Sequence, residues 1–340
     1  MKVMPYFAAL AMLVGVATSV PTQAQDRHFL VVTASNTTTN NLLVYNSASQ
    51  LVQTVPTGGS GGVAGNAGGI ATSRERLAVV NFGSENVSIF VRSEKGLRLE
   101  QVIPTVSSPL SITFGHGHLY VLGSTTVESH QVFDFGVNPG IDGKAGLIKA
   151  DGSAAQVGVL NKQLILSEKS NAIETVNLTW DGAIEGDATM VQNIPSNVNA
   201  PFGLVTRDNE AYVTIAHANE ISLVRNDTVL TVTGSGTQSA PCWVTLDGPY
   251  LFSANSPSKS VSRYVVYGQK IVQDAAVAAS FSGNPTDVAY KNGLLGVIDG
   301  ASGVSHLSVF NVDGDGNLTL TGVSTINSAA NGVAIVPTED

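Results

Sequence analysis

Cysteine, charged side chains and aromatic rings are all scarce in this sequence of 340 residues. Its one cysteine, Cys242, has no partner for an internal disulfide, so the burial of apolar side chains must stabilise the fold. Charged residues make up only 13% of the chain, which argues against coiled coils and long surface helices. A net charge of -9 and an aromatic content of 6% argue against nucleic acid or an anionic membrane surface as a partner. A hydrophobic content of 43% excludes a disordered chain.

The first 24 residues have the pattern of a secretory signal peptide. Lys2 gives a basic start, residues 7–20 form an apolar run, and residues 22–24 supply small side chains for cleavage. A membrane anchor is the alternative, but the run is shorter than the ~20 residues that span a bilayer, and no later run is longer. We therefore expect residues 1–24 to be a signal peptide. Residues 25–340 are expected to form one exported domain, secreted or periplasmic, without a membrane span.

Seven copies of a short pattern follow one another along the chain. Each copy begins at an anchor position and has an aliphatic residue three positions later. The first six copies also have a leucine or alanine ten positions after the anchor. The anchors are spaced 42, 45, 47, 40, 44 and 45 residues apart, which indicates a repeat architecture. They are Ala67, Pro109, Ala154, Pro201, Pro241, Pro285 and Ala330.

Each copy contains short runs rich in Val, Ile and Tyr between polar turns, with almost no helical periodicity. In the copy that starts at Ala67, the first strand begins at Ile70, the second covers residues 77–80 and the third covers residues 87–91. A weaker fourth strand closes the copy. Four strands in about 40–45 residues is the period of a β-propeller blade. The sequence therefore predicts an all-β protein built from blades.

The last copy supplies only its first strand, residues 332–336, before the chain ends. The missing strands lie at the other end of the chain, in residues 29–33, in residues 42–45 and in a fourth strand after them. The two ends complete one blade together, which closes a ring of seven blades and removes a sheet edge. A β-solenoid is the alternative, but a solenoid does not need one repeat to be divided between the termini.

The segment Leu77–Phe90, LAVVNFGSENVSIF, looks like a YVTN-type blade repeat, and residues 211–214 and 252–255 are weaker copies of it. The chain resembles the secreted, lactonase-like seven-bladed β-propellers, relatives of the 6-phosphogluconolactonase and 3-carboxymuconate cyclase propellers. The resemblance implies a seven-bladed ring and an activity on a lactone in its central funnel. The repeated residues are core and turn residues, so they carry the fold rather than the activity.

The loops that lead into the innermost strands contain no charged residue apart from Asp151. The lactonase-like enzymes typically have Arg and His directly after the anchor proline, and none of the seven corresponding pairs here contains either residue. A funnel lined by amides and hydroxyls predicts a binding module for an uncharged polar ligand, such as an oligosaccharide, or for a protein partner. We expect a monomer. The alternative is a lactonase or muconate-cyclase-like enzyme that acts on a lactone in the central funnel.

Four residues from loops of this face are candidates for catalysis: Asp287, Asp299, Glu168 and His217. His217 and Cys242 would form a nucleophilic pair only if they lay within ~3–4 Å, and a buried structural cysteine is the alternative. Five further residues are candidates for contact with a ligand on this face: Asn81, Cys242, Trp243, Phe202 and Asn331.

A calcium ion is the one cofactor that the sequence suggests. Asp287 and Asp299, joined by Glu168 or Asn81, supply the hard oxygen ligands that Ca²⁺ prefers. The alternative is that Asp287 caps the amides of a loop. Residues 313–317, DGDGN, lack the later ligands of a calcium loop and predict a hairpin turn.

Residues 57–69 contain seven glycines in thirteen positions. They include formal matches to G-x-S-x-G and G-x-G-x-x-A, but no helix follows, so the context that gives these motifs a meaning is missing. The glycines predict a flexible or tightly turning loop over the funnel, where backbone amides are available to a ligand.

Overall fold

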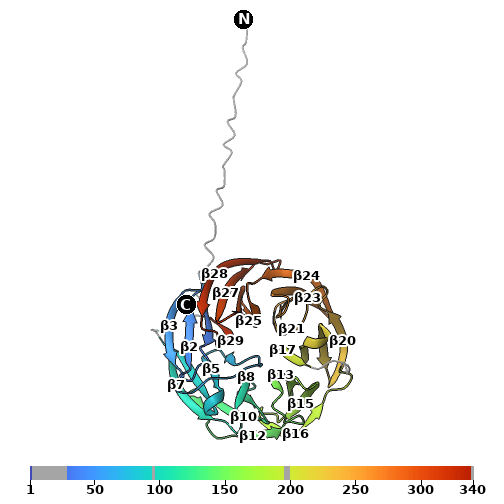
Figure 1. Cartoon of the computed structure of the whole chain (residues 1–340). Helices are drawn as coiled ribbons and strands as arrows, with labels where there is room; N and C mark the ends of the chain where they lie inside the picture. Colours follow the sequence, from blue (N-terminus) through green and yellow to red (C-terminus); the bar gives the residue numbers. More distant parts are fainter. Residues whose placement is uncertain (2–28, 94–95, 195–199, 338–340) are drawn as a thin grey trace.

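Each of the seven repeats forms one small antiparallel sheet, and the sheets surround a common axis (Figure 1). The computed structural model describes residues 1, 29–93, 96–194 and 200–337. The predicted signal peptide therefore lies outside the described residues apart from Met1. Among these residues no helix has the length and apolarity that crossing a bilayer requires. The prediction of an all-β, seven-bladed β-propeller is confirmed.

The first four blades run in chain order. Blade 1 contains β4 (Ile70–Thr72), β5 (Arg76–Asn81), β6 (Asn86–Ser93) and β7 (Gly96–Pro104). Blade 2 contains β8 (Pro109–Gly115), β9 (His118–Gly123), β10 (Thr126–Phe133), β11 (Gly136–Val137) and β12 (Gly143–Gly146). Blade 3 contains β13 (Ala154–Val159), β14 (Gln163–Glu168), β15 (Ala172–Leu178) and β16 (Ile184–Met190). Blade 4 contains β17 (Pro201–Arg207), β18 (Glu210–Ile215), β19 (Glu220–Arg225) and β20 (Thr228–Gly234).

The other three blades complete the ring. Blade 5 contains β21 (Pro241–Asp247), β22 (Tyr250–Asn255), β23 (Ser260–Tyr267) and β24 (Lys270–Ser280). Blade 6 contains β25 (Asn284–Lys291), β26 (Leu294–Ala301), β27 (Val304–Val312) and β28 (Leu318–Ile326). Blade 7 contains β29 (Asn331–Pro337), β1 (Phe29–Ala34), β2 (Asn41–Tyr45) and β3 (Leu51–Pro56). Two 3-10 turns, η1 (Phe82–Ser84) and η2 (Ala216–Ala218), follow second strands.

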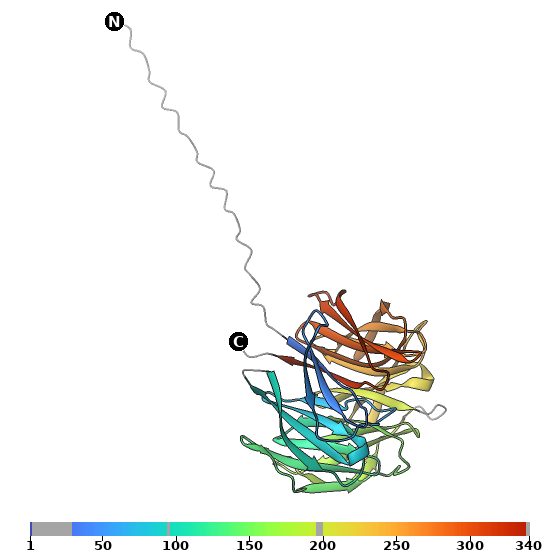
Figure 2. The same cartoon turned by 60° about the vertical axis from the view of Figure 1, so that its left-hand side comes forward.

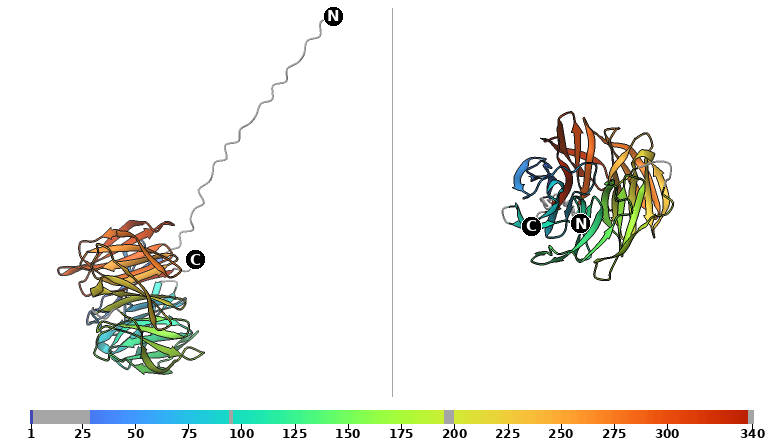
Figure 3. Two further views of the ribbon diagram at one scale, coloured as in Figure 1. Left: turned by 90° about the vertical axis from the view of Figure 1, so that its right-hand side faces the viewer. Right: turned by 60° about the horizontal axis from the view of Figure 1, so that its bottom comes forward.

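The two ends of the chain close the ring as predicted. The last strand, β29, pairs with β1 from Phe29 opposite Pro337 to Ala34 opposite Asn331. Figure 2 shows the red β29 beside the blue β1. Val31 and Val32 in β1 are both fully buried although their side chains point to opposite faces of the sheet. Both faces of this strand are therefore covered by neighbouring blades (Figure 3), which is why near-continuous aliphatic runs are found in place of alternation.

The innermost strands, β4, β8, β13, β17, β21, β25 and β29, contact one another in sequence around the axis, and β29 contacts β4. We call the face where they begin the upper face, and the face where they end, at turns such as 116–117 and 292–293, the lower face. In six blades a bulge follows the anchor residue of the innermost strand or lies within one residue of it. In blades 2, 3 and 6 the side chain two positions after the anchor reaches the next blade.

Three blade junctions use this side chain as a hydrogen-bond acceptor. The Oγ of Ser111 accepts from the N–H of Val157 at 3.2 Å, and the Oε1 of Gln156 accepts from the N–H of Leu204 at 2.7 Å. Asp287 accepts in the same way from the N–H of Val333 in blade 7. Each of these bonds holds the start of one innermost strand against the next and so fixes the geometry of the axis.

A buried polar residue fourteen positions after the anchor holds the top of four blades together. These residues are Asn81, Glu168, Asn255 and Asp299, which are at most 2% exposed. The Oδ1 of Asn81 accepts from the Thr57 hydroxyl and the Asn40 amide, and its Nδ2 donates to Asn86 and Ser88, all within 2.9 Å. The YVTN-like asparagine therefore joins the third strand of its blade to the loop before the first.

We expect Asn81→Ala to lower the free energy of unfolding by about 3 kcal/mol, because several buried polar partners lose their hydrogen bonds. The midpoint of urea unfolding measures the loss. Asn41→Ala is the matched control, since Asn41 is partly exposed and its amide donates only to the carbonyl of Thr39. Equal effects of the two substitutions would contradict this role for Asn81.

Candidate functional site

The glycine-rich loop of residues 57–69, which we call the strap, lies across the upper end of the axis. Its fold depends on positions where only glycine fits. Gly62 has a φ of +100°, and a Cβ on Gly61 would lie 2.4 Å from the main chain of Asn36. The loop turns tightly and lies over the funnel, as predicted.

The strap is tied to blades on opposite sides of the ring. The side-chain amide of Asn66 donates to the carbonyl of Leu110 in blade 2 at 2.6 Å, and the Trp243 indole of blade 5 donates to the Asn66 carbonyl at 3.1 Å. The N–H of Ala67 donates to a blade 3 carbonyl, and Asn36 of blade 7 bonds the backbone around Val63. The strap therefore closes the upper mouth by hydrogen bonds to the surrounding blades.

A cavity of about 210 Å³ lies along the axis beneath the strap. Its upper end is formed by Ala67, Gly68 and Trp243, of which Ala67 and Trp243 are at most 9% exposed. Its lower end is formed by Thr72, Tyr290 and Lys291, all partly exposed. The cavity is therefore closed at the upper face and reached from the lower face, opposite to the mouth that the loop composition suggested.

Aliphatic side chains make most of the cavity wall, and the charged lining residues are Asp287 and Lys291. Gln156 of blade 3 and Asp287 of blade 6 stand two positions after their anchors, so they lie at the same level of the ring on different sides of the axis. Gln156 uses its Oε1 to bond Leu204, which leaves its Nε2 to donate. Thr245 accepts from the N–H of Tyr290 at 3.0 Å, which leaves its hydroxyl proton to donate.

Asp287 is the buried acid of this cavity, 5% exposed. Its Oδ1 accepts from the N–H of Val288 at 2.8 Å, and its Oδ2 accepts from the N–H of Val333 in blade 7 at 2.9 Å. Burial raises the pKa of Asp287 to about 7, although both backbone hydrogen bonds lower it. The expectation that Asp287 caps backbone amides agrees with these contacts, and the raised pKa adds a carboxyl group that exchanges protons near neutral pH.

Asp299 lies on the other side of blade 6 from Asp287. It accepts from the N–H of Gly283 at 2.8 Å and from the Nδ1 of His306 at 3.4 Å. Asp299 and His306 line a groove of about 410 Å³ together with Phe281 of the loop that follows blade 5. The structure therefore does not bring Asp287 and Asp299 together around one ligand. No group of three or more His, Cys, Asp or Glu in the described ranges is placed to hold a metal ion.

Glu168 is fully buried in blade 3 beside Glu174. Its pKa is raised, first by burial and then by the neighbouring Glu174 carboxylate. Glu174 accepts from the N–H groups of Ile148 and Lys149 at 3.0 Å. Glu168 lies outside the lining of the axial cavity.

No hydrogen bond joins Cys242 and His217 among the described residues. Burial raises the pKa of the Cys242 thiol to about 11, and its other influence is a backbone hydrogen bond from Ser256. His217 is exposed in η2. A thiol that stays protonated at neutral pH is a poor nucleophile, so the structure favours a structural cysteine.

The remaining candidates for ligand contact, Phe202, Trp243, Asn331 and Asn81, lie at the upper end of the ring, which the strap covers. Phe202 and Trp243 pack edge to face with ring centroids 5.1 Å apart, and the ammonium group of Lys169 lies over the Phe202 ring. Asn331 begins β29 near the strap residue Gly69. Asn81 is bound in its hydrogen-bond network. Among these residues only Trp243 lines the cavity.

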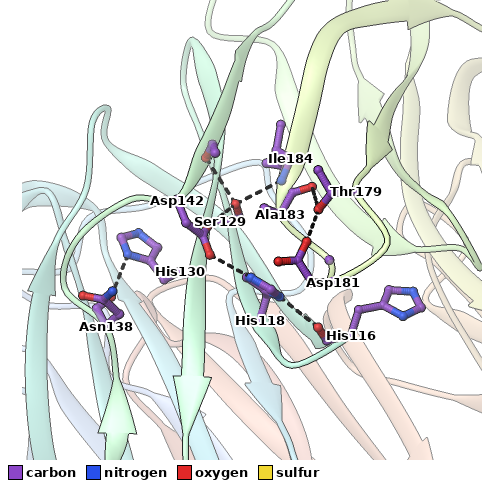
Figure 4. A network of polar contacts seen from close by, with 12 residues as sticks. His116, His118, Ser129, His130, Asn138, Asp142, Thr179, Asp181, Ala183 and Ile184 are labelled. Atoms are coloured by element: carbon purple, nitrogen blue, oxygen red, sulfur yellow. Dashed lines mark hydrogen bonds and ion pairs between the residues drawn. The ribbon is translucent and has the colours of Figure 1, made fainter.

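A serine, a histidine and an aspartate also meet between blades 2 and 3, but in an order that does not suit catalysis (Figure 4). Asp142 lies in the middle: the Ser129 hydroxyl donates to its Oδ1 at 2.6 Å, and the Nε2 of His118 bonds its Oδ2 at 2.7 Å. A hydrolytic triad needs the histidine between the other two. Ser129 also accepts from the N–H of Ile184 in β16 at 3.2 Å, so the cluster joins two blades.

Sequence reasoning identified Asp287 but missed Gln156, Thr245 and Lys291. Gln156 was present in the residue pairs after the anchors, and its place in the repeat is the signal that could have found it. Thr245 and Lys291 lie on the lower halves of their strands. They were missed because the sequence analysis considered only the loops of the upper face.

We expect the stability of the protein relative to Asp287→Asn to fall as the pH rises from about 4 to 7 and to be constant above that. A raised acid pKa means that the folded state binds the proton more tightly than the unfolded state, so the stabilisation is present at low pH and is lost as the pH passes the folded pKa. The difference is on the order of 4 kcal/mol across this window. Urea unfolding of both proteins at several pH values measures it, and parallel curves would contradict the assignment.

Comparisons with known proteins agree with the fold but do not identify the reaction. No protein-family model matches the sequence, and no curated protein does either. A solved structure described as a periplasmic gluconolactonase from Pseudomonas aeruginosa is 14% identical, with a TM-score of 0.66, and the match covers 92% of this chain and 99% of that one. A proposed 6-phosphogluconolactonase from Bacteroides fragilis is 15% identical, with a TM-score of 0.66 and the same coverage.

A virginiamycin B lyase from Staphylococcus aureus is also similar, with 15% identity, a TM-score of 0.55, and coverage of 81% of this chain and 92% of that one. At these identities the likeness concerns the arrangement of the strands. The chain thus has the fold of the lactonase-like seven-bladed β-propellers.

Proposed function

We propose that this protein hydrolyses a small neutral lactone in the axial cavity, with Asp287 as the general base. The observation that carries the proposal is a buried carboxyl group with a pKa of about 7 on the wall of a cavity that lies on the axis. A carboxyl group poised near neutral pH is suited to exchange protons with a substrate or water. The structural neighbours described as gluconolactonases favour this activity over that of a binding module without chemistry.

The step needs only water and the side chains of the cavity. The Asp287 carboxylate takes a proton from a water molecule, whose oxygen attacks the lactone carbonyl carbon. The Nε2 of Gln156 and the hydroxyl of Thr245 donate to the negative charge that develops on the carbonyl oxygen. The ring C–O bond then breaks, and the proton passes from Asp287 to the leaving ring oxygen to give a hydroxy acid.

The lining favours a neutral substrate. It contains neither Arg nor His, and its one cation, Lys291, lies at the lower end, four residues along β25 from Asp287. A phosphorylated lactone would leave most of its charge without the charge-assisted hydrogen bonds that it needs. A volume of about 210 Å³ suits a small ring, and the substrate would enter from the lower face because the strap covers the upper end.

We also propose that the protein is exported. The N-terminal sequence supports this, and one structural neighbour is described as periplasmic. An exported location would disfavour sugar phosphates as substrates, in agreement with a lining that contains a single cation.

We expect the purified protein to hydrolyse neutral lactones, tested with δ-valerolactone, γ-butyrolactone and glucono-δ-lactone, at least tenfold faster in kcat/KM than 6-phosphogluconolactone. Asp287→Asn should lower kcat/KM about 100-fold, because the general base is lost. The rate of the wild type should rise about tenfold per pH unit below pH 7 and level off above it. Acid release in a pH-indicator assay between pH 5 and 8 measures these rates.

Asp151→Asn is the matched control, because Asp151 is an exposed aspartate of the upper face and lies outside the cavity lining. It should leave the rates unchanged. The predicted binding module for an uncharged polar ligand stays as the second candidate, because both oxygens of Asp287 already accept backbone hydrogen bonds. Binding of a lactone or sugar without turnover of any lactone would favour that module and reject the hydrolase.

A further inference from the structure

Blade 2 departs from the pattern of the other blades in its outer part. Its outer edge is divided into two short strands: β11 pairs with the lower end of β10, and β12 pairs with the upper end. The turn at residues 134–135 lies on the lower face, next to blade 1, and the loop of residues 138–142 separates the two strands. A repeat whose outer strand departs from the others is a suitable place for a binding site, because the other repeats keep the scaffold.

Blade 1 holds this turn through two side chains. Arg76, which is 7% exposed, donates to the Oε2 of Glu100 at 2.9 Å and to the carbonyl of Asp134 at 2.7 Å. Gln101 bonds the main chain of Val137 twice, from its Nε2 at 2.7 Å and to its Oε1 at 3.2 Å. The turn is therefore fixed from the neighbouring blade.

Blade 2 itself holds the other end of this segment, residues 134–142. Asp142 is bound by Ser129 and His118, as Figure 4 shows, and the Nδ1 of His130 bonds the carbonyl of Asn138 at 3.0 Å. His130 and Ser129 are fully buried. Hydrogen bonds therefore hold residues 134–142 at both ends.

This segment presents an aromatic ring to solvent. Phe135 is 83% exposed, and its ring stacks on Phe133 with centroids 5.1 Å apart and an angle of 3° between the planes. The stack fixes the orientation of the outer ring. Folding does not account for its position, since a ring so exposed contributes little to the core.

A groove of about 490 Å³ lies beside the two rings, at the junction of blades 1 and 2. Its apolar wall is completed by Val137 and Pro139, and its polar groups come from Glu100, Gln101 and Asn138. The Gln101 amide is engaged by Val137, whereas Glu100 uses Oε2 for Arg76 and keeps Oε1 for another donor. The groove thus combines an aromatic face, a carboxylate and an amide.

We propose that this groove binds a neutral pyranose ring of a glycan, with one C–H face of the sugar on Phe135 and its hydroxyls on Glu100 and Asn138. A pyranose has an apolar face and a polar edge, which match the ring and the acceptors of the groove. A protein partner would need a contact surface of about 800 Å² per side, much more than these eight lining residues offer. The site is separate from the axial cavity and does not depend on lactone hydrolysis.

The test uses the full mature chain and soluble oligosaccharides as probes: cellohexaose, maltohexaose, mannohexaose and xylohexaose, measured by isothermal titration calorimetry. We expect at least one to bind, and Phe135→Leu to weaken that binding at least tenfold because the side chain keeps its bulk but loses the flat ring. Phe135→Tyr should restore the affinity to within about threefold. Trp180→Ala is the matched control, since Trp180 is a 98% exposed aromatic residue of the neighbouring blade outside the groove.

Thermal melting of each variant establishes that it is folded, and lactone turnover should be unchanged in all three. Binding that survives Phe135→Leu, or is lost equally in Trp180→Ala, would overturn the proposal. Absence of binding for all four probes would also overturn it, whatever the outcome of the lactone assay. Loss of turnover with sugar binding intact would instead reject only the hydrolase.

Discussion

The pairing of β29 with β1 is the contact on which the rest of the structure depends. Without it the seventh sheet has no innermost strand, and the ring has two open sheet edges. The axial cavity depends on the same contact, because β29 supplies Val333 both to its wall and to the Oδ2 of Asp287. The buried acid therefore exists in its present environment only when the two ends of the chain have met. Fold and candidate chemistry are joined at this position.

The polar loops of the upper face suggest that a ligand binds there. The strap explains why the axial cavity does not open on that face. Asn66 bonds Leu110 on one side of the ring, and Trp243 on another side bonds Asn66. These contacts hold the strap over the upper end of the axis, so the cavity opens at its lower end. Burial under the strap is also what makes the environment of Asp287 poor in water, and so raises its pKa.

The seven blades could be predicted because core positions recur in the sequence. In each repeat the anchor, the aliphatic residue and the second strand lie at fixed distances from one another. The direction of a polar side chain could not be predicted in this way. Asp287 and Asp299 are twelve positions apart and face different neighbouring blades, because a bulge after Pro285 shifts the register between their strands. The contact of Trp243 with Asn66 joins residues 177 positions apart, and no local pattern records it.

Comparison of equivalent positions separates structural acids from the functional candidate. Glu168 and Asp299 occupy the position that Asn81 and Asn255 hold in other blades, and all four bind groups at the top of their own blade. The carboxyl groups of Glu168 and Asp299 therefore have the same structural role as the amides of Asn81 and Asn255. Asp287 occupies a position that is glycine in blades 1, 4 and 7, and its side chain borders a cavity. Phe135 likewise lies where blade 2 leaves the repeat. Since a repeat conserves its geometry through the residues that recur, chemistry particular to this protein is to be sought where one copy differs from the others and the difference faces open space.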